Sequence, residues 1–235
     1  MALRFSYLLI AVLCLSNIGL AQDKKTLNIQ RAENAPKIDG ILDDKAWANA
    51  EIATDFIQFE PDIGNRRPKN ERTEVKITYD DNAIYIAAHL FDDPNKIMRQ
   101  LSSRDNFSQS DFFLVVLNPN NDSQNDTHFV VFSSGQQADA IVNPSIGKDY
   151  SWNSVWDSKV KIVEDGWVVE MKIPYAALRF SSEKKQTWGV NFYREVRNLR
   201  QKFTWNRIDN NINNEANQAG ILEGIENIET PTRLF

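Results

Sequence analysis

The clearest alternation of apolar and polar positions runs over residues 72–93. In its first half, Val75, Ile77 and Tyr79 alternate with polar residues, which predicts a strand with one apolar face. Residues 80–82, Asp-Asp-Asn, are typical of a turn because their short side chains bond to nearby backbone. In the second half, apolar residues occupy both faces of the strand. The stretch therefore predicts a β-hairpin whose second strand is covered on both sides, and so a fold of two layers.

Similar strand patterns recur along the chain. Residues 112–117 are a continuous apolar run, which predicts another strand buried on both faces. Further strands are predicted at 56–61, 128–132, 138–142, 156–162, 167–173, 188–196, 203–206 and 221–228. Short helical segments are predicted at 43–50, where Trp47 should be a core residue, at 94–101 and at 175–178. With about ten to twelve strands at regular spacing, we predict an all-β antiparallel β-sandwich of jelly-roll type with one or two short helices.

Residues 1–21 have the pattern of a secretory signal peptide. Arg4 precedes an apolar run at 7–15, and small residues precede a cleavage site after Ala21. The run is shorter than the roughly 20 residues that a membrane-spanning helix needs. Lipoprotein processing at Cys14 is an alternative, but the bulky residue before this cysteine disfavours it. We therefore predict export to the periplasm, the cell surface or the extracellular space.

The rest of the chain is consistent with one domain without disulfides. The only cysteine lies in the predicted signal peptide, which leaves no disulfide and no cysteine-based metal site in the mature chain. Residues 22–36 predict a flexible leader, 37–229 one sandwich domain, and 230–235 a tail or a join to a further C-terminal region. Acidic residues outnumber basic ones by 32 to 27, for a net charge of −5, which disfavours nucleic acid as a partner.

Five motifs follow one another in a recognisable order. They are Ile38-Asp39-Gly40 with Trp47, Tyr79-Asp80-Asp81 with Ile84-Tyr85-Ile86, Asp111 before an apolar strand, Gly166-Trp167 leading to Ile173-Pro174, and Trp188-Gly189-Val190-Asn191-Phe192. In this order they resemble the carbohydrate-binding module family 9 group, which belongs to the wider DOMON-like β-sandwiches. The arrangement also resembles the N-terminal module of exported Bacteroidetes-type proteins that carry a barrel-like C-terminal region.

The resemblance implies a site that grips the end of a sugar chain between two aromatic rings. One aromatic position matches Trp205, and the other falls near Phe107. The pattern departs where the family has an acid, since Leu114 stands at about that place, and where it has an arginine, since the strand reads Phe-Val-Val-Phe over 129–132. The fold therefore transfers to this chain more completely than the sugar contacts do.

Two tryptophans lie beside amide side chains, as a glycan site requires. Trp205 precedes Asn206, and Trp152 lies in the Ser/Asn-rich segment 151–154. Aromatic rings can stack on the apolar face of a sugar while amides bind its hydroxyl groups. The alternative is that these rings close the ends of the sandwich.

Arg194 falls in register with apolar residues of its predicted strand. A charge there must be paired or must line a cavity, so it either binds ligand or forms an ion pair, with Asp111 as a possible partner. A third alternative is a bulge that turns it outward. We expect Phe107, Asp111, Arg194 and Trp205 to converge on one ligand site.

Metal, haem and enzyme chemistry have weaker signals. The loop 118–126 places oxygen atoms at alternate positions, as calcium loops do, but lacks the glycine and glutamate of an EF-hand. A solvated loop is the simpler interpretation, although the resemblance leaves a structural calcium ion possible. DOMON relatives can bind haem, yet His89 and His128 lie on separate predicted strands. G-x-S-x-G, H-E-x-x-H and phosphate-loop motifs are absent from the sequence.

The sequence thus predicts an exported, non-catalytic module that binds polysaccharide or oligosaccharide by aromatic stacking and requires no cofactor. The alternative is a structural accessory domain of an outer-membrane barrel protein or another cell-envelope partner, without sugar binding. A role in glycan breakdown would require a catalytic partner outside this chain.

Overall fold

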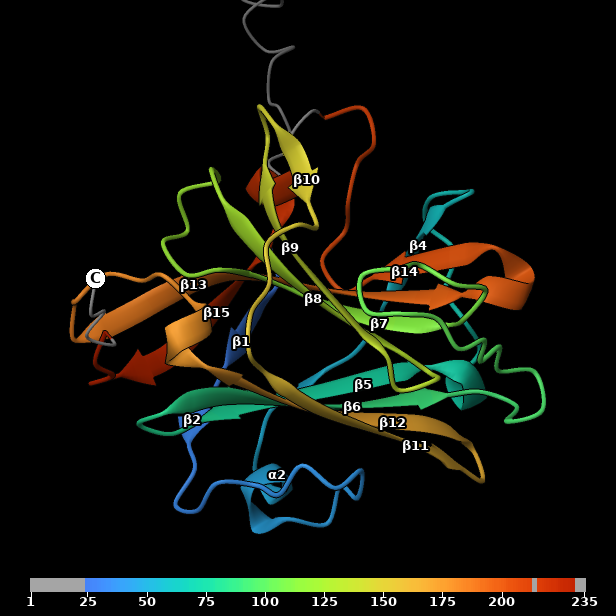
Figure 1. Ribbon diagram of the computed structural model, residues 1–235, viewed down its shortest axis with the longest axis horizontal. Helices are drawn as coiled ribbons and strands as arrows, with labels where there is room; N and C mark the ends of the chain where they lie inside the picture. The colour runs from blue at the N-terminus through green and yellow to red at the C-terminus, as the bar shows by residue number, and fades with distance from the viewer. Residues whose placement is uncertain (1–23, 213–214, 231–235) are drawn as a thin grey trace, which may run out of the picture.

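The computed structural model describes residues 24–212 and 215–230 (Figure 1). The predicted signal peptide, 1–21, and all but the first residue of the predicted tail, 230–235, lie outside the described residues. The strands are β1 (Thr26–Asn28), β2 (Gln30–Arg31), β3 (Ile52–Ala53), β4 (Ile57–Glu60), β5 (Thr73–Tyr79), β6 (Ala83–Phe91), β7 (Phe112–Asn118), β8 (Asp126–Phe132), β9 (Gln137–Asn143), β10 (Gly147–Asp149), β11 (Asp157–Val163), β12 (Gly166–Pro174), β13 (Lys185–Val196), β14 (Gln201–Thr204) and β15 (Gly220–Glu226). The helical elements are α2 (Lys45–Ala48) and the 3-10 turns η1 (Lys69–Glu71), η2 (Tyr175–Ala177), η3 (Arg197–Leu199) and η4 (Glu215–Gln218).

These strands form two stacked sheets, which confirms the predicted β-sandwich. The larger sheet has the order β1-β15-β13-β7-β8-β9-β10, with β14 pairing to β13 and to β4. The smaller sheet has the order β11-β12-β6-β5-β2, with β3 also pairing to β5. Figure 1 shows the smaller sheet beneath the larger one, with α2 on its far side and with β9 and β10 rising above the larger sheet. Two of the described strand pairs, β1 with β15 and β2 with β5, are parallel.

The predicted hairpin at 72–93 is the β5–β6 pair in the smaller sheet. Tyr79 lies opposite Ile84 in its register, and Asp80 accepts the amide hydrogens of the turn. One face of β6 contributes to the main core between the sheets. On its other face, Tyr85 packs in a separate cluster with Trp47 of α2, as predicted for both strand and tryptophan.

A buried glutamate holds α2 and the chain before it against the smaller sheet. Glu170 of β12 accepts hydrogen bonds from Trp47 Nε1 at 3.1 Å, from the Gly40 amide at 2.8 Å and from the Asp39 amide at 3.0 Å. Gly40 has a φ of +81°, which a residue with a side chain rarely adopts. The motif Ile38-Asp39-Gly40 thus helps to cover the second face of β6.

Two predictions about local structure are corrected. Within the predicted flexible leader, 22–36, residues 26–31 add β1 and β2 to the two sheets, because the side chains of Leu27 and Ile29 are buried in the main core. The predicted helix at 94–101 does not form. Asp93 instead accepts the amide hydrogen of Asn95 at 3.0 Å, and this local turn competes with a helix.

Arg194 is a structural residue that joins the two sheets. Its side chain is fully buried on the core-facing side of β13. The guanidinium donates to Asp92 Oδ2 at 2.6 Å, to the Phe91 carbonyl at 3.0 Å, to the Glu71 carbonyl at 3.0 Å and to Thr73 Oγ1 at 3.2 Å. The prediction that Arg194 forms an ion pair is therefore confirmed, but the partner of Arg194 is Asp92 and not Asp111.

The cluster around Arg194 holds a second arginine. Arg67 Nη2 lies 3.1 Å from Asp92 Oδ2 and 2.7 Å from Glu71 Oε2. Burial, followed by the charge of Arg67, lowers the pKa of Arg194 to about 10. The guanidinium therefore stays charged at neutral pH, and its hydrogen bonds offset the loss of hydration.

Arg194→Met is expected to lower the free energy of unfolding by about 3 kcal/mol. The substitution keeps much of the side-chain volume but removes the donor to the Phe91 carbonyl and the fully buried charge that pairs with Asp92, while Arg67 continues to bond to Asp92 and to the Glu71 carbonyl. Urea unfolding followed by circular dichroism measures the change. The control Lys161→Met, at an exposed position of β11, should change stability by less than about 0.5 kcal/mol. Equal effects of the two substitutions would contradict the structural role.

Candidate functional site

The face of the larger sheet that points away from the smaller sheet is apolar at its centre. Side chains alternate between the faces of a strand, and alternate residues of β7, β8 and β13 share this outer face. Leu114 lies opposite both Val130 and Tyr193 in the strand register. The residues of this outer cluster are Phe59, Phe112, Leu114, Val116, Val130, Phe132, Ala138, Tyr193 and Ile208. Because no further sheet covers them among the described residues, loops must shield this face.

Phe107 is the exposed ring on this face. Its side chain is 44% exposed, and its ring packs edge-on against Phe132 at 5.2 Å, Tyr150 at 5.3 Å and Phe112 at 5.9 Å between centroids. Across the cavity, Phe59 and Tyr193 form another edge-on pair at 5.5 Å. The aromatic contacts hold Phe107 in place and leave part of its ring open to a ligand.

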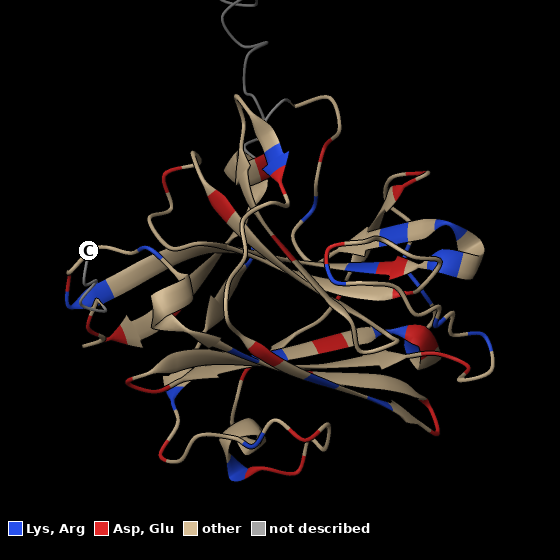
Figure 2. Cartoon of the chain, in the orientation of Figure 1, with Lys and Arg blue, Asp and Glu red and all other residues tan. Residues whose placement is uncertain are grey.

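These rings surround a cavity of about 330 Å³, which we call the outer cavity. Ion pairs lie on its rim, with Lys202 Nζ 2.7 Å from Glu60 Oε2 and Arg197 Nη1 2.7 Å from Glu195 Oε1. Figure 2 shows acidic and basic positions close together where β14 lies. The cavity thus combines an aromatic floor with charged groups that can exchange hydrogen bonds with a polar ligand.

Three titratable groups that line the outer cavity, His128, Tyr150 and Tyr193, are neutral at physiological pH. Burial, with a smaller effect of Lys148, lowers the pKa of His128 to about 3. Burial also raises the pKa of Tyr150, and it raises that of Tyr193 well above the ordinary value. The Tyr193 hydroxyl donates to Glu215 Oε2 at 3.2 Å. The centre of the site therefore favours a ligand without charge.

A fully buried carboxylate positions the two loops that carry the exposed rings. Asp139 of β9 accepts from Arg104 Nη2 at 2.6 Å and from the Ser154 amide at 2.6 Å. The Asp105 carboxylate in turn accepts the Asp139 amide hydrogen at 3.0 Å. The segment that leads to Phe107 and the segment that follows Tyr150 are thus tied to one strand edge.

Asn206, predicted to bind ligand, instead anchors a loop. Its amide donates to the Gln218 carbonyl at 2.7 Å, its Oδ1 accepts from the Lys25 amide at 2.8 Å, and its backbone bonds in both directions with the Asn191 side chain. The side chain is buried, so it cannot reach a ligand. This network holds the chain that brings Glu215 to the outer cavity.

Trp205 lies in the main core and is only 3% exposed. Its ring lies 5.5 Å from that of Phe192, and a Cβ on Gly220 would come within 2.6 Å of its Cζ3 atom. The predicted role of Trp205 as an exposed platform is thus corrected, because the end of β14 directs it between the sheets.

The structure does not bring together the four residues expected to converge. Phe107 lies on the outer face, whereas Arg194 and Trp205 lie between the sheets. Asp111 is buried at the start of β7, where its Oδ1 accepts the Arg197 amide hydrogen at 3.0 Å. Burial is the main cause that raises the pKa of Asp111 to about 6. Of the four, only Phe107 contributes to the outer cavity.

Sequence reasoning missed Tyr150, Tyr193 and Phe59. A usable signal existed for Tyr193, because alternation along its strand places it on the face opposite Arg194. The position where the family pattern has an acid also falls on this outer face. Leu114 stands at about that place and lies opposite Val130, so the centre of the face is apolar there.

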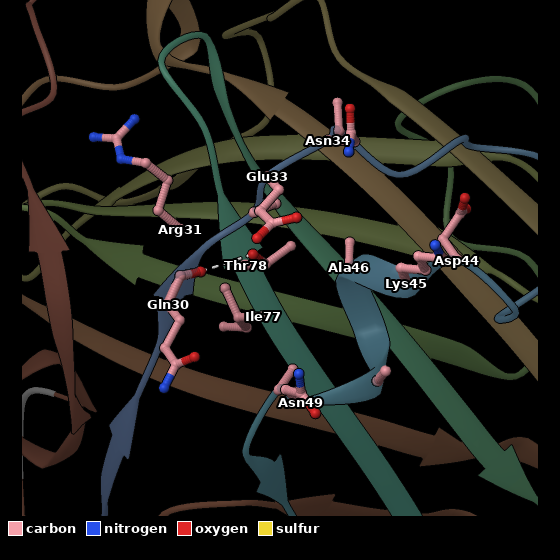
Figure 3. Close-up of a pocket in the computed structure, with 14 residues that line it drawn as sticks. Gln30, Arg31, Glu33, Asn34, Asp44, Lys45, Ala46, Asn49, Ile77 and Thr78 are labelled. Atoms are coloured by element: carbon pink, nitrogen blue, oxygen red, sulfur yellow. Dashed lines mark hydrogen bonds between the residues drawn. The ribbon is translucent and has the colours of Figure 1, made fainter.

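Two further cavities differ from the outer cavity, one in its lining and one in the face of the sheet on which it lies. A cavity of about 550 Å³ lies between β2, β5 and α2 (Figure 3) and is lined by Glu33, Asn34 and Lys45 among others, but no described residue brings an aromatic ring to it. Thr78 Oγ1 donates to the Gln30 carbonyl at its edge at 2.8 Å. Trp152 lines a separate groove on the other face of β8.

The described residues contain no group of three or more His, Cys, Asp or Glu side chains that could hold a metal ion. In the loop 118–126, interpreted from the sequence as solvated, Asn118 Nδ2 donates to Asp126 Oδ1 at 3.1 Å, and Asp122 Oδ1 accepts from the Gln124 amide at 2.9 Å. A structural calcium ion stays a prediction. Within the same residues, no helix has the length and apolar character to cross a membrane.

Comparison with known proteins agrees with this architecture. A family model described as carbohydrate family 9 binding domain-like matches residues 38–223. A family 9 carbohydrate-binding module from Caldicellulosiruptor kristjanssonii, solved with cellotriose, superposes with a TM-score of 0.63 at 19% identity and covers 90% of this chain and 99% of that one. A putative carbohydrate-binding protein from Bacteroides uniformis ATCC 8492 gives a TM-score of 0.64 at 13% identity, covering 86% and 99%. A search of curated proteins finds no match.

The structural likenesses show the β-sandwich fold. The family match goes further, because it spans most of the chain: this protein belongs to the carbohydrate family 9 binding domain-like family. Modules of this family are carbohydrate-binding domains and are generally non-catalytic.

Asp139→Asn is expected to lower the free energy of unfolding by about 2 kcal/mol. The substitution keeps one acceptor oxygen but turns an amide toward the Ser154 amide hydrogen and removes the charge that pairs with Arg104. Urea unfolding measures the loss, and near-ultraviolet circular dichroism reports the packing of the rings on both loops. Asp157→Asn, at an exposed position, is the matched control. Unchanged spectra and stability would show that Asp139 does not organise these loops.

Asp126→Asn should raise stability at neutral pH. Burial, opposed by Asn118 and helped by Glu215, raises the pKa of Asp126 from 3.8 to about 6. The folded protein therefore binds this proton more tightly than the unfolded chain, and the contribution of Asp126 to stability falls as pH rises from about 4 to 6. The substitution keeps the acceptor for Asn118 Nδ2 and removes the charge, so stability at pH 7 should rise by about 2 kcal/mol.

Unfolding of the wild type and of Asp126→Asn between pH 3.5 and 7 tests this prediction. Across this window the raised pKa values of Asp111 and Asp126 lower stability as pH rises, whereas the lowered pKa of His128 raises it. Asp111 and His128 contribute equally to both proteins, so the difference between the two profiles isolates Asp126: the variant should gain stability relative to the wild type as pH rises from about 4 to 6. Identical pH profiles for the two proteins would contradict the raised pKa of Asp126.

Proposed function

We propose that this protein is an exported, non-catalytic carbohydrate-binding module that stacks a glycan on the aromatic rings of the outer cavity. The observation that carries the proposal is the exposed ring of Phe107, held edge-on by Phe112, Phe132 and Tyr150 at the border of a cavity with a polar rim. A sugar ring has an apolar face that suits such a platform and hydroxyl groups that suit the rim.

The charges of the rim favour a neutral sugar. The basic residues Lys148, Arg197 and Lys202 are matched by the acidic residues Glu60, Glu195 and Glu215. Side chains held in ion pairs can still donate to, and accept from, hydroxyl groups, whereas a charged ligand would disturb the balance. Structures of family 9 modules with cellotriose and with glucose support a sugar of this kind.

The apolar floor distinguishes the proposed mode of binding from one built on a buried ion pair. Leu114, at about the place where the family pattern has an acid, lies opposite Val130. Recognition would therefore rest on stacking and on hydrogen bonds at the rim. The same pair also favours the second candidate function, a structural accessory domain of a barrel-like or other cell-envelope partner that binds no sugar.

The cellular role follows from the proposed binding. The sequence of residues 1–21 supports export. A binding module without catalytic motifs would bring a catalytic partner outside this chain to its polysaccharide substrate. A join to a barrel-like C-terminal region near residues 230–235 would place the module at the cell envelope.

Phe107→Ala is expected to weaken glycan binding about tenfold, because the stacking platform is lost while the fold keeps its core. Isothermal titration calorimetry with glucose, cellotriose and a panel of neutral oligosaccharides of other linkages measures the affinity. Phe91→Ala is the matched control, since this partly exposed ring lies in the smaller sheet.

Two outcomes would count against the proposal. Affinity that is equal in Phe107→Ala and in the control would remove the outer cavity as the site. Absence of heat across the whole panel, with the protein shown to be folded, would favour the structural accessory function.

A further inference from the structure

A second groove lies on the opposite face of β8 and β9 from the outer cavity. Its floor is formed by Thr127 and Ile141, which are neighbours across the β8–β9 pair, and its volume is about 470 Å³. Both residues lie on the side that also carries Phe129 of the main core, at the end where the core stops. We propose that this lateral groove is a second glycan-binding site, with Trp152 as its platform.

Trp152 has the position that a stacking residue needs. Its side chain is half-buried and packs edge-on against Phe129, with 6.3 Å between ring centroids, while the rest of the indole lines the groove. Val155, which is 87% exposed, adds an apolar contact on the rim. An indole that is fixed by the core on one side loses little freedom when a sugar stacks on it.

The polar side chains around Trp152 have unused hydrogen-bonding capacity. Asn125 accepts at its oxygen from Asn143, at 3.1 Å, and keeps its own amide hydrogens available. Asn153 donates to the Ser151 carbonyl at 3.2 Å and keeps its side-chain oxygen available. Planar amides of this kind can bridge neighbouring hydroxyl groups of a sugar ring.

Charge narrows the ligand class for the lateral groove. Arg179 is the only charged side chain among the described residues that line it, and no described acid pairs with this arginine. A neutral sugar fits this lining, and a cationic ligand does not. The choice of a sugar rests on the proposed function, whereas the position of the groove and of its platform does not.

One rigid loop connects the two sites. Tyr150 packs against Phe107 on the outer face, and Trp152 packs against Phe129 on the inner face, so the chain crosses the edge of the larger sheet between them. The Ser154 amide hydrogen bond to Asp139 then anchors the loop at 2.6 Å. The two platforms are thus linked through residues 150–152 but lie on opposite faces of the larger sheet, so each binds its own glycan.

Indole resonances in ¹⁵N-labelled protein test the lateral groove directly. The chain has six tryptophans, and Trp152→Phe assigns the one that matters. On titration with cellotriose and the neutral oligosaccharide panel, the Trp152 resonance should shift saturably in the wild type and in Phe107→Ala.

Ala176→Arg provides a variant that leaves the core untouched. Ala176 is exposed on η2 and lines the groove, so a long side chain there blocks the groove without removing packing from Phe129. The variant should abolish the saturable shift of the Trp152 resonance. It should leave the binding that depends on Phe107 unchanged. Ala48→Arg, at an exposed position of α2, is the matched control.

The outcomes separate this proposal from the proposed function. In one outcome, the Trp152 resonance does not shift, while other resonances report binding that is weakened in Phe107→Ala. This result would overturn the lateral groove and leave the outer cavity intact. A saturable shift of Trp152 with no effect of Phe107→Ala on any binding would support the lateral groove and overturn the outer cavity. The absence of any shift across the panel would overturn both.

Discussion

Two strands, β6 and β7, are apolar on both faces, and the architecture follows from how their outer faces are covered. The second face of β6 is covered by Trp47 and the chain from Ile38 onward, which Glu170 holds with three hydrogen bonds. The outer face of β7 receives only loops among the described residues. Loops shield an apolar sheet incompletely, and the gap that remains is the outer cavity with its exposed ring.

Buried polar groups turn these loops into rigid walls. Asp139 ties two ring-bearing loops to the edge of β9, and Asn206 ties a third to β13. Such groups must be fully bonded to be tolerated inside a protein, so they specify one loop conformation. The platforms at Phe107 and Trp152 are consequently formed before a ligand arrives, which reduces the entropy lost on binding.

The fold and part of the site could be predicted before the structure, for physical reasons. Strand alternation is a local property, so the β5–β6 hairpin, the buried β7 and the sandwich were predicted correctly. Phe107 was also identified, and the lack of an acid at Leu114 anticipated the apolar floor. Trp205 and Asn206 were placed in a binding loop because a tryptophan next to an amide resembles a glycan site, yet their burial depends on packing that local sequence does not report.

Periodicity and order of motifs thus suffice for the class of fold and the family, because they describe which face of each strand must be buried. They also required Arg194 to be paired. The partner of Arg194, the convergence of Phe107 with Tyr150 and the crossing of one loop between two grooves depend on contacts between residues far apart in the chain. Those contacts are chosen by packing and by the satisfaction of buried polar groups, and both exist only once the sheets are assembled.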